Sequence, residues 1–197
     1  VATLEATGQA DNTIVIVTSD NGADLSGGQA GFGHASNAWW RGQKADIHEG
    51  GHRVPFVARW PGVIPAGTVS DATICLTDVF ATVADVAGAT LPAGAAPDSV
   101  SFRAILEGAP PATQVRTSIV HHSMNGTFAL RSGPWKLSTA LGTGGFTAPR
   151  DIDATPGGPT GTLFHLGDDP QEAVDVFLEQ PDVVARLQVD LVGVRTR

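Results

Sequence analysis

The stretch Asn12–Gly22, NTIVIVTSDNG, indicates the fold class. Its β-branched residues run without a break over Thr13–Thr18, and the polar residues Asp20, Asn21 and Gly22 follow almost at once. An apolar run without alternation predicts a strand buried on both faces, which is typical of parallel sheets in α/β proteins. We therefore expect an α/β fold in which this strand ends in a polar turn.

The composition limits the size of the fold and the kinds of partner that the chain can bind. The chain has 197 residues, 42% of them hydrophobic, which is enough for one ordinary domain with a real core. Twenty acidic against 12 basic residues give a formal charge of -8, which disfavours nucleic acid and anionic membranes as partners. There is no run of about 18 apolar residues for a membrane span. The single cysteine, Cys75, excludes an internal disulfide and a multi-cysteine metal site.

The pattern predicts two lobes, residues 1–112 and 113–197. In the first, Val54–Trp60 is a second strand, and Thr77 caps a helix over Asp78–Ala87. The apolar face of that helix is predicted to comprise Val79, Phe80, Val83 and Val86. Two strands do not form a stable parallel sheet alone, so this lobe is expected to be incomplete, to expose apolar surface and to associate with another chain.

The second lobe is predicted to be a small antiparallel sheet packed with one helix. The helix begins at Pro181, and the Gly-rich stretch Leu141–Gly161 is expected to be a long mobile loop. Ser132-Gly133-Pro134 predicts a hairpin turn. The predicted strands are Thr117–His121, Thr127–Arg131, Trp135–Ser138 and Thr162–Leu166.

Asp20 and Asn21 are candidate metal ligands. They follow a strand, where α/β proteins collect ligands, and carboxylate and amide oxygens suit Ca²⁺ or Mg²⁺. The alternative is a simple turn, because Asp-Asn-Gly also reverses a chain. Calcium takes about six to eight oxygens, so most of its ligands would have to come from elsewhere.

Lys44 is a candidate anion contact. It is one of only two lysines and lies in the segment Trp40–Trp60, with Arg41 and Arg53 near enough in sequence to add a bidentate grip. The alternative is a surface salt bridge from Lys44 to Asp46 or Glu49.

The other candidates are weaker. His48 and His52 have the spacing of a helical zinc site, but Gly50 and Gly51 between them argue against a helix. Cys75 is expected in the core, and no Gly-x-Ser-x-Gly motif is present. We expect structural or solvent-exposed roles for all six histidines, which are His34, His48, His52, His121, His122 and His165.

Together these segments resemble the C-terminal half of a type I, formylglycine-dependent sulfatase of the alkaline-phosphatase superfamily. The resemblance covers nearly the whole chain, in family order. The stretch NTIVIVTSDNG resembles the metal-binding strand of the family, and HASNAWWRGQKADIHEGGHRVPFVARWPGVIPAG its sulfate-contacting loop. The stretches TDVFATVADVAGATLP, GTFALRSGPWKL and LFHLGDDPQEAVDVFLEQPDVVARL resemble the helix and the C-terminal subdomain that follow.

The resemblance implies a role for three residues. Asp20 and Asn21 match the second pair of calcium ligands, and Lys44 matches the lysine that contacts the sulfate. Lys44 would then neutralise charge on the sulfuryl oxygens as the S–O bond breaks. Scaffold roles are implied for Arg41, Glu49, Gly50, Gly51 and Arg53. No role is carried over to Asp78 or His34.

One departure matters most. The family oxidises a cysteine or serine in a Cys/Ser-x-Pro-x-Arg motif to formylglycine, and these 197 residues contain no such motif. Ser132–Lys136 (SGPWK) imitates part of it but ends in lysine. The family's first aspartate pair and catalytic histidine would precede Val1, a start that lacks a methionine and a signal peptide. We therefore expect a chain that is inactive alone.

The expected partners are a sulfate ester, small molecule or glycan, and either the missing N-terminal half or a second copy of the chain. The resemblance also implies a periplasmic or secreted protein. Two alternatives stay open: a non-catalytic binding module derived from a sulfatase, and a phosphoester hydrolase of the same superfamily.

Overall fold

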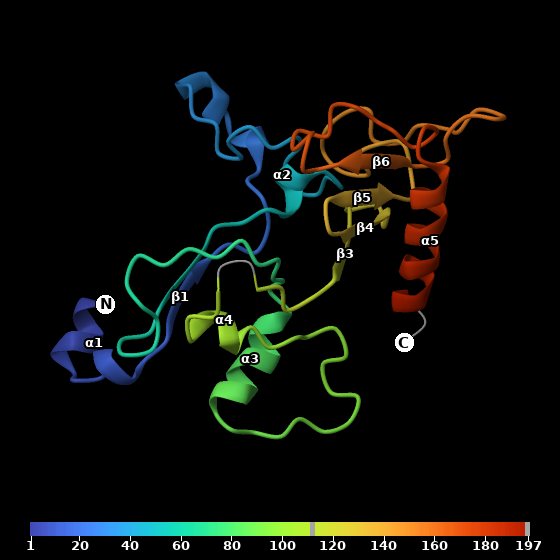
Figure 1. The fold of residues 1–197 in the computed structure, drawn as a ribbon. Helices are drawn as coiled ribbons and strands as arrows, with labels where there is room; N and C mark the ends of the chain where they lie inside the picture. Colours follow the sequence, from blue (N-terminus) through green and yellow to red (C-terminus); the bar gives the residue numbers. More distant parts are fainter. Residues whose placement is uncertain (111–112, 196–197) are drawn as a thin grey trace. The chain divides into compact units, whose positions relative to one another are not determined.

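The computed structural model describes residues 1–110 and 113–195, which form two compact units (Figure 1). The first unit comprises Val1–Ser19 and Pro55–Thr117, and the second comprises Asp20–Val54 and the chain from Ser118 on. The segment 20–54, which the sequence analysis assigns to the first lobe, thus groups with the C-terminal residues. Within the described ranges, no helix has the length and apolar character needed to cross a membrane.

The strands of the first unit lie where they were predicted, but they pair differently. Strand β1 pairs antiparallel with β2, and Val17 lies opposite Val57. Both valines are 62% exposed. The expected parallel sheet with a strand buried on both faces is therefore wrong for this chain. A β-branched run reports strand propensity, whereas burial depends on layers that a two-stranded pair does not supply. The elements of this unit are α1 (Ala2–Ala6), η1 (Ala10–Asn12), β1 (Val15–Thr18), β2 (Phe56–Arg59), α3 (Asp78–Val86) and α4 (Arg103–Leu106).

Helix α3 confirms the predicted helix within one residue, but its buried face is polar. Asp78 and Thr82 are buried, whereas Phe80 and Val83 are more than half exposed. Thr77 does not cap the helix with its side chain. The expected apolar face is therefore wrong at Phe80 and Val83, whereas Val79 and Val86 are half-buried. The expected Thr77 side-chain cap is also wrong, because buried hydrogen bonds of Asp78 hold the start of this helix.

The buried contact of α3 is made by the Asp78 carboxylate. It accepts hydrogen bonds from the backbone N–H of Cys75 and of Val100, both at 2.8 Å, and forms an ion pair with Arg116. Cys75 itself is half-buried rather than a core residue. Asp78 therefore ties the start of α3 to two later parts of the first unit, a structural role.

The second unit is a four-stranded antiparallel sheet in the order β3-β4-β5-β6. Its strands and hairpin agree with the predicted ones to within one residue at each end, since each short alternating run stands between turn residues. Its elements are η2 (Leu25–Gly27), η3 (Gln29–Phe32), α2 (Glu49–His52), β3 (Ser118–His122), β4 (Phe128–Ser132), β5 (Trp135–Ser138), β6 (Thr162–His165) and α5 (Pro181–Arg195).

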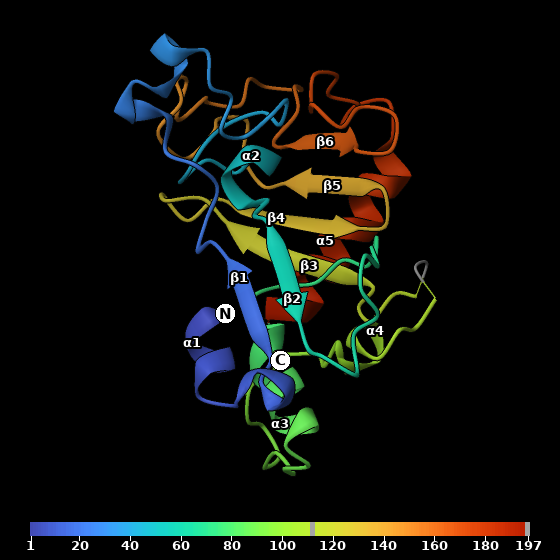
Figure 2. The ribbon, with the colours of Figure 1, turned by 90° about the vertical axis from the view of Figure 1, so that its left-hand side faces the viewer.

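Helix α5 covers one face of this sheet (Figure 2). It begins at Pro181 as predicted, and its apolar residues, spaced three and four apart, meet the alternate residues of the strands. The core between them consists of Leu130, Leu137, Leu163, Val184, Leu187 and Leu191, all at most 6% exposed.

The opposite face of the sheet carries Arg131 and Lys136, which are register partners on β4 and β5. The segment around α2 covers this face, because Lys136 contacts Glu49 and the His48 ring lies edge-on to Phe164 at 6.3 Å. The sheet is thus a layer between α5 and the segment that carries Lys44.

The Gly-rich loop Leu141–Gly161 is packed at its start rather than free. Residues 142–145 are buried, and the Ile47 N–H donates to the Thr143 carbonyl at 2.8 Å. Composition predicted mobility, but the small residues here allow close backbone contact with the 45–47 segment.

Candidate functional site

The three predicted site residues lie on two segments that are hydrogen-bonded to each other. The Lys44 N–H donates to the Ala23 carbonyl at 3.0 Å, and the Gly22 N–H donates to the Gly51 carbonyl at 3.0 Å. Asp20 and Lys44 are exposed, and Asn21 is half-buried. The fold therefore brings the backbone that carries the metal candidates against the backbone that carries the anion candidate.

Asn37 strengthens this junction. Its side-chain oxygen accepts from the Ala23 N–H at 2.8 Å, and its Nδ2 donates to the Gly42 carbonyl at 3.1 Å. The contact also requires a glycine at position 22, because a Cβ there would lie 1.8 Å from the Gly50 carbonyl oxygen. The Asp-Asn-Gly sequence is thus more than a surface turn.

Asp20 and Asn21 suit a hard cation but cannot hold one unaided. They offer carboxylate and amide oxygens, the donors that Ca²⁺ prefers. In the part of the chain that the structure describes, no group of three or more His, Cys, Asp or Glu residues is placed to bind a metal. These two residues therefore offer donors for part of a calcium shell, and a complete shell would need further oxygen ligands.

Lys44 lies in a tight turn over residues 43–46. The Asp46 N–H donates to the Gln43 carbonyl at 3.0 Å, and Ala45 has a positive φ of 78°. No salt bridge found in residues 1–110 and 113–195 involves Lys44. The alternative of a surface salt bridge to Asp46 or Glu49 is wrong, because both carboxylates are buried and bonded elsewhere.

Beneath the Lys44 segment lies a buried ion cluster, which we call the Lys136 cluster. The Lys136 Nζ, on a side chain only 1% exposed, is 3.0 Å from Glu49 Oε1 and 2.8 Å from Glu172 Oε1. Arg53 Nε lies 2.7 Å and Arg131 Nη1 3.5 Å from Glu49 Oε2. Burial alone would raise the pKa of Glu49, but the charges of Lys136, Arg53 and Arg131 outweigh it and lower that pKa to about 2.

Glu172 joins a third segment to this cluster. Its Oε2 accepts from the Glu49 N–H at 2.7 Å, and its carbonyl accepts from Arg41 Nη1 at 2.5 Å. Burial would raise the pKa of Glu172, yet hydrogen bonding to His48 and the charge of Lys136 lower it. No motif or spacing in the sequence singled out Glu172. The only local signal for Lys136 was a lysine inside an otherwise apolar strand.

The arginines of this segment also have structural partners. Arg53 lies over the Trp40 ring, 3.8 Å from its centroid, besides pairing with Glu49. Arg41 binds the Glu172 carbonyl. These contacts account for Arg41 and Arg53 without the bidentate anion grip and agree with the scaffold role that the family resemblance implies.

The histidines also have structural surroundings. The rings of His52 and His121 lie 4.1 Å apart between centroids. Burial lowers the pKa of His52 to about 4 and that of His121 well below its usual value. Although α2 forms one helical turn despite its glycines, His48 precedes it and lies 3.5 Å from the Glu172 carboxylate. The expectation that Gly50 and Gly51 prevent a helix here is therefore wrong, and the contact with Glu172 gives His48 a structural partner.

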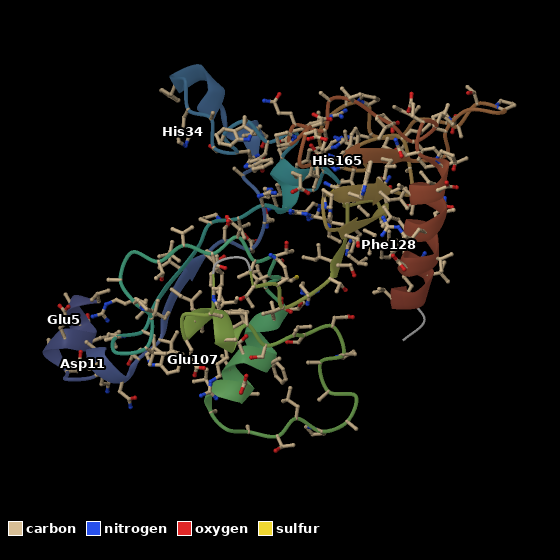
Figure 3. The ribbon with its side chains drawn as sticks, in the orientation of Figure 1. Glu5, Asp11, His34, Glu107, Phe128 and His165 are labelled. Atoms are coloured by element: carbon tan, nitrogen blue, oxygen red, sulfur yellow. The ribbon has the colours of Figure 1, made fainter. Side chains whose placement is uncertain are left out.

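The remaining histidines are spread over the second unit. Figure 3 shows His34 on the excursion that carries η2 and η3, away from β6, which carries His165. His34 is exposed, and His165 Nδ1 is 2.7 Å from Asp168 Oδ2. His122 lies beside the Ser123 carbonyl, at 2.8 Å. Within the described ranges, no contact joins any of these three histidines to Lys44.

The arrangement therefore holds one exposed cation, Lys44, and two candidate oxygen ligands, Asp20 and Asn21, on segments that are hydrogen-bonded to each other. It does not include a nucleophile: Ser132–Lys136 forms the β4–β5 hairpin, where Lys136 is committed to the buried cluster. Within the described residues, the site thus presents a candidate anion contact and candidates for part of a metal shell.

The chain was compared with protein families and known proteins. The Sulfatase family model matches residues 1–89. An N-acetylgalactosamine-6-O-sulfatase from Bacteroides thetaiotaomicron is 32% identical over 99% of this chain and 39% of its own length. A steryl-sulfatase from Rattus norvegicus is 44% identical over 55% of this chain and 19% of its own length.

The structural comparison agrees. A solved structure from work on the metabolism of multiple glycosaminoglycans by Bacteroides thetaiotaomicron has a TM-score of 0.85 and 31% identity, and the match covers 100% of this chain and 41% of that one. The chain belongs to the sulfatase family. The chain spans about two fifths of the length of the N-acetylgalactosamine-6-O-sulfatase and of the solved structure.

Proposed function

We propose that this chain is the C-terminal portion of a sulfatase that hydrolyses sulfate esters with a divalent cation, calcium being the expected one. In this proposal Lys44 contacts the sulfate, and Asp20 and Asn21 are two of the metal ligands. Residues 1–112 contribute to the catalytic lobe and residues 113–197 form the C-terminal subdomain. Without the formylglycine nucleophile, the 197 residues do not turn over substrate alone.

The observation that carries the proposal is the junction between the two candidate segments. Because the Lys44 N–H bonds to the Ala23 carbonyl and the Gly22 N–H bonds to the Gly51 carbonyl, the Asp20–Asn21 pair and Lys44 belong to one structural element. A structural turn and an unrelated surface lysine would not require the close backbone packing that leaves no room for a Cβ at position 22.

The chemistry follows from the charges. A sulfate monoester gathers negative charge on its leaving oxygen and its sulfuryl oxygens as the S–O bond breaks. Lys44, whose backbone is held by its turn and whose side chain is exposed, can oppose this charge with its ammonium. A divalent cation, when bound, would polarise the same oxygens as a Lewis acid. Asp20 and Asn21 would hold that cation with their side-chain oxygens.

The substrate class is proposed to be a sulfated sugar. The support is the relative that matches 99% of this chain, which is an N-acetylgalactosamine-6-O-sulfatase. A phosphoester hydrolase of the same superfamily remains the main competitor, since the oxygens of a phosphate ester would meet the same lysine and metal ligands. A non-catalytic sulfated-glycan binder is the other.

The test supplies the missing chemistry. The chain is fused behind the N-terminal region of the Bacteroides thetaiotaomicron relative and assayed on N-acetylgalactosamine 6-sulfate and on the corresponding phosphate. We expect calcium-dependent hydrolysis that is faster on the sulfate. Asp20→Ala should raise the calcium requirement by at least the roughly ten- to hundredfold that loss of an outer-shell partner costs. Asp153→Ala, which removes the same charge from an exposed loop residue, is the control.

Each other outcome favours a competing function. Faster hydrolysis of the phosphate would favour the phosphoester hydrolase. A fusion that folds and binds the sulfated sugar without hydrolysing it would favour the binding module. Equal effects of Asp20→Ala and Asp153→Ala would contradict a ligand role for Asp20.

A further inference from the structure

We propose that residues 143–147 position Lys44 for its anion, and that Thr147 is the principal positioning residue. The inference rests on the proposed sulfate contact of Lys44. It assigns a function to part of the Gly-rich loop, which neither the charge pattern nor the motifs of the sequence connect with the site.

The link between Thr147 and the Lys44 turn is the Asp46 carboxylate. Asp46 is fully buried, and its Oδ1 accepts from the Thr147 N–H at 3.0 Å. Its Oδ2 accepts from the Thr147 hydroxyl at 2.5 Å and from the Gln43 N–H at 3.0 Å. The carboxylate therefore joins both ends of the 43–46 turn to residue 147.

A second hydrogen bond joins Thr147 to the start of the 43–46 turn. Gln43 Nε2 donates to the Thr147 hydroxyl oxygen at 3.1 Å, so the same oxygen serves both residues that flank the turn. Gln43 Oε1 in turn accepts from the Leu25 N–H at 2.9 Å. Thr147 thus stands at the centre of a network that reaches the segment following the metal candidates.

Close packing supports the same face of the turn. A Cβ at Gly145 would lie 2.4 Å from the Ala45 carbonyl carbon and oxygen and 2.5 Å from the Asp46 N. The Thr143 carbonyl accepts from the Ile47 N–H at 2.8 Å, and the Met124 N–H donates to the Ala45 carbonyl at 2.9 Å. Residues 143–147 therefore lie directly against the backbone on the C-terminal side of Lys44.

Such support matters because a lysine is a point charge on a flexible stem. Fixing its Cα leaves only the side chain to be ordered when an anion binds. Misplacing a contact group by about 1 Å can reduce a rate about a hundredfold. The buried hydrogen bonds of Asp46 and Thr147 supply this constraint without touching the anion.

The test uses the 197-residue chain with inorganic sulfate as the probe. Sulfate is titrated while the NMR signals of the Lys44 amide and ammonium are followed, and the melting temperature is measured in parallel. Thr147→Val removes the hydroxyl that bonds to Asp46 and Gln43. It should weaken sulfate binding by about tenfold, which is the scale expected for the loss of a hydrogen bond to a charged group. Thr147→Ser, which keeps the hydroxyl, should restore it.

Thr139→Val is the matched control. The Thr139 hydroxyl also makes two hydrogen bonds, both 3.1 Å long and both to the Phe128 backbone, in the same unit. Thr139→Val should lower the melting temperature about as much as Thr147→Val does, but it should not change the affinity for sulfate. Parallel changes in stability and affinity in both variants would overturn the positioning role.

Two further results distinguish the inference from the proposed function. If Lys44→Ala weakens sulfate binding but Thr147→Val does not, the positioning role is overturned and the sulfate contact stands. If the unaltered chain and Lys44→Ala respond to sulfate alike, the sulfate contact fails, and the positioning role fails with it.

Discussion

Replacing Lys136 by methionine should destabilise the second unit strongly. Methionine keeps most of the apolar stem, so the change chiefly removes the ammonium. Glu49 and Glu172 then remain buried, having lost a cation that lies 3.0 and 2.8 Å from their oxygens. Arg53 and Arg131 still face Glu49, but Glu172 keeps only His48 and the Glu49 N–H as polar partners of its carboxylate within the described residues.

The magnitude follows from burial. Removing one partner of a buried ion pair costs about 3–5 kcal/mol because it leaves an uncompensated charge. The pKa of Glu49, lowered from 4.5 to about 2, gives a similar scale, since about 1.4 kcal/mol per pKa unit corresponds to roughly 3 kcal/mol. We expect Lys136→Met to reduce the free energy of unfolding by about 3–5 kcal/mol at pH 7.

The chain supplies its own control, because it has only one other lysine. Lys44 is exposed, so Lys44→Met should change the free energy of unfolding by less than about 0.5 kcal/mol. Both variants are measured by urea denaturation followed by circular dichroism. Adding Glu172→Gln to Lys136→Met should recover part of the loss, because Glu172 is the carboxylate that is left without a cation other than His48, and glutamine is neutral.

Acid provides a second check on the same cause. Since Glu49 has a folded-state pKa below its unfolded one, its ionised form contributes stability above pH 4.5, and that contribution is lost as the pH falls toward 2. The difference between Lys136→Met and the unaltered chain should therefore shrink over that range. An unfolding free energy for Lys136→Met equal to that of Lys44→Met at pH 7 would refute the reasoning.

Three other outcomes are expected. Burial lowers the pKa of His52 to about 4, so the unfolded chain binds a proton at this residue at a higher pH than the folded chain does. The free energy of unfolding should therefore fall by about 3 kcal/mol between pH 6.5 and 4. Urea denaturation of His52→Gln should show a smaller fall, and an equal fall would contradict this cause. Gly22→Ala should lower the free energy of unfolding by about 1–3 kcal/mol, because its Cβ clashes with the Gly50 carbonyl. Gly31→Ala is the control and should be nearly neutral, because a Cβ there meets no atom within 4 Å. Equal melting temperatures of the two variants would argue against the close junction. The exposed Val17–Val57 pair should make the chain self-associate in sedimentation experiments, Val57→Lys should weaken that association, and a monodisperse monomer would disprove it.

Local patterns predicted the second unit well. The strand Trp135–Ser138 has its predicted bounds, and the last helix begins at Pro181 as predicted and buries Val184, Leu187 and Leu191. Each of these elements has a hydrophobic period that its own residues reveal, and the turn residues between them mark the ends. Such signals do not depend on which segment lies alongside.

The first unit was predicted less well for a physical reason. The β-branched run around Val17 identifies a strand but says nothing about the strand beside it, so the antiparallel pairing with β2 and the exposure of Val17 were not foreseen. Similarly, Phe80 looked like a core residue by helical period, whereas the buried contact of α3 is made by Asp78 with Arg116, 38 residues away.

The site shows the same limit. Asp20, Asn21 and Lys44 were singled out by residue type and local sequence, and the backbone bond from Lys44 to Ala23 joins their segments. The Lys136 cluster was invisible, because Lys136 meets Glu49 and Glu172 across 87 and 36 residues. Thr147 was hidden in a Gly-rich stretch in which nothing local marks a residue that binds Asp46.

The most direct measurement is the kcat/KM for sulfate-ester hydrolysis by the fusion with the N-terminal sulfatase region, with and without Lys44→Ala. If Lys44 opposes the charge that develops on the sulfate, its loss should lower kcat/KM about a hundredfold or more, as removal of one oxyanion-stabilising donor does. The melting temperature should stay unchanged, because the side chain is exposed. A kcat/KM equal to that of the unaltered fusion would contradict the assignment of Lys44 as the sulfate contact.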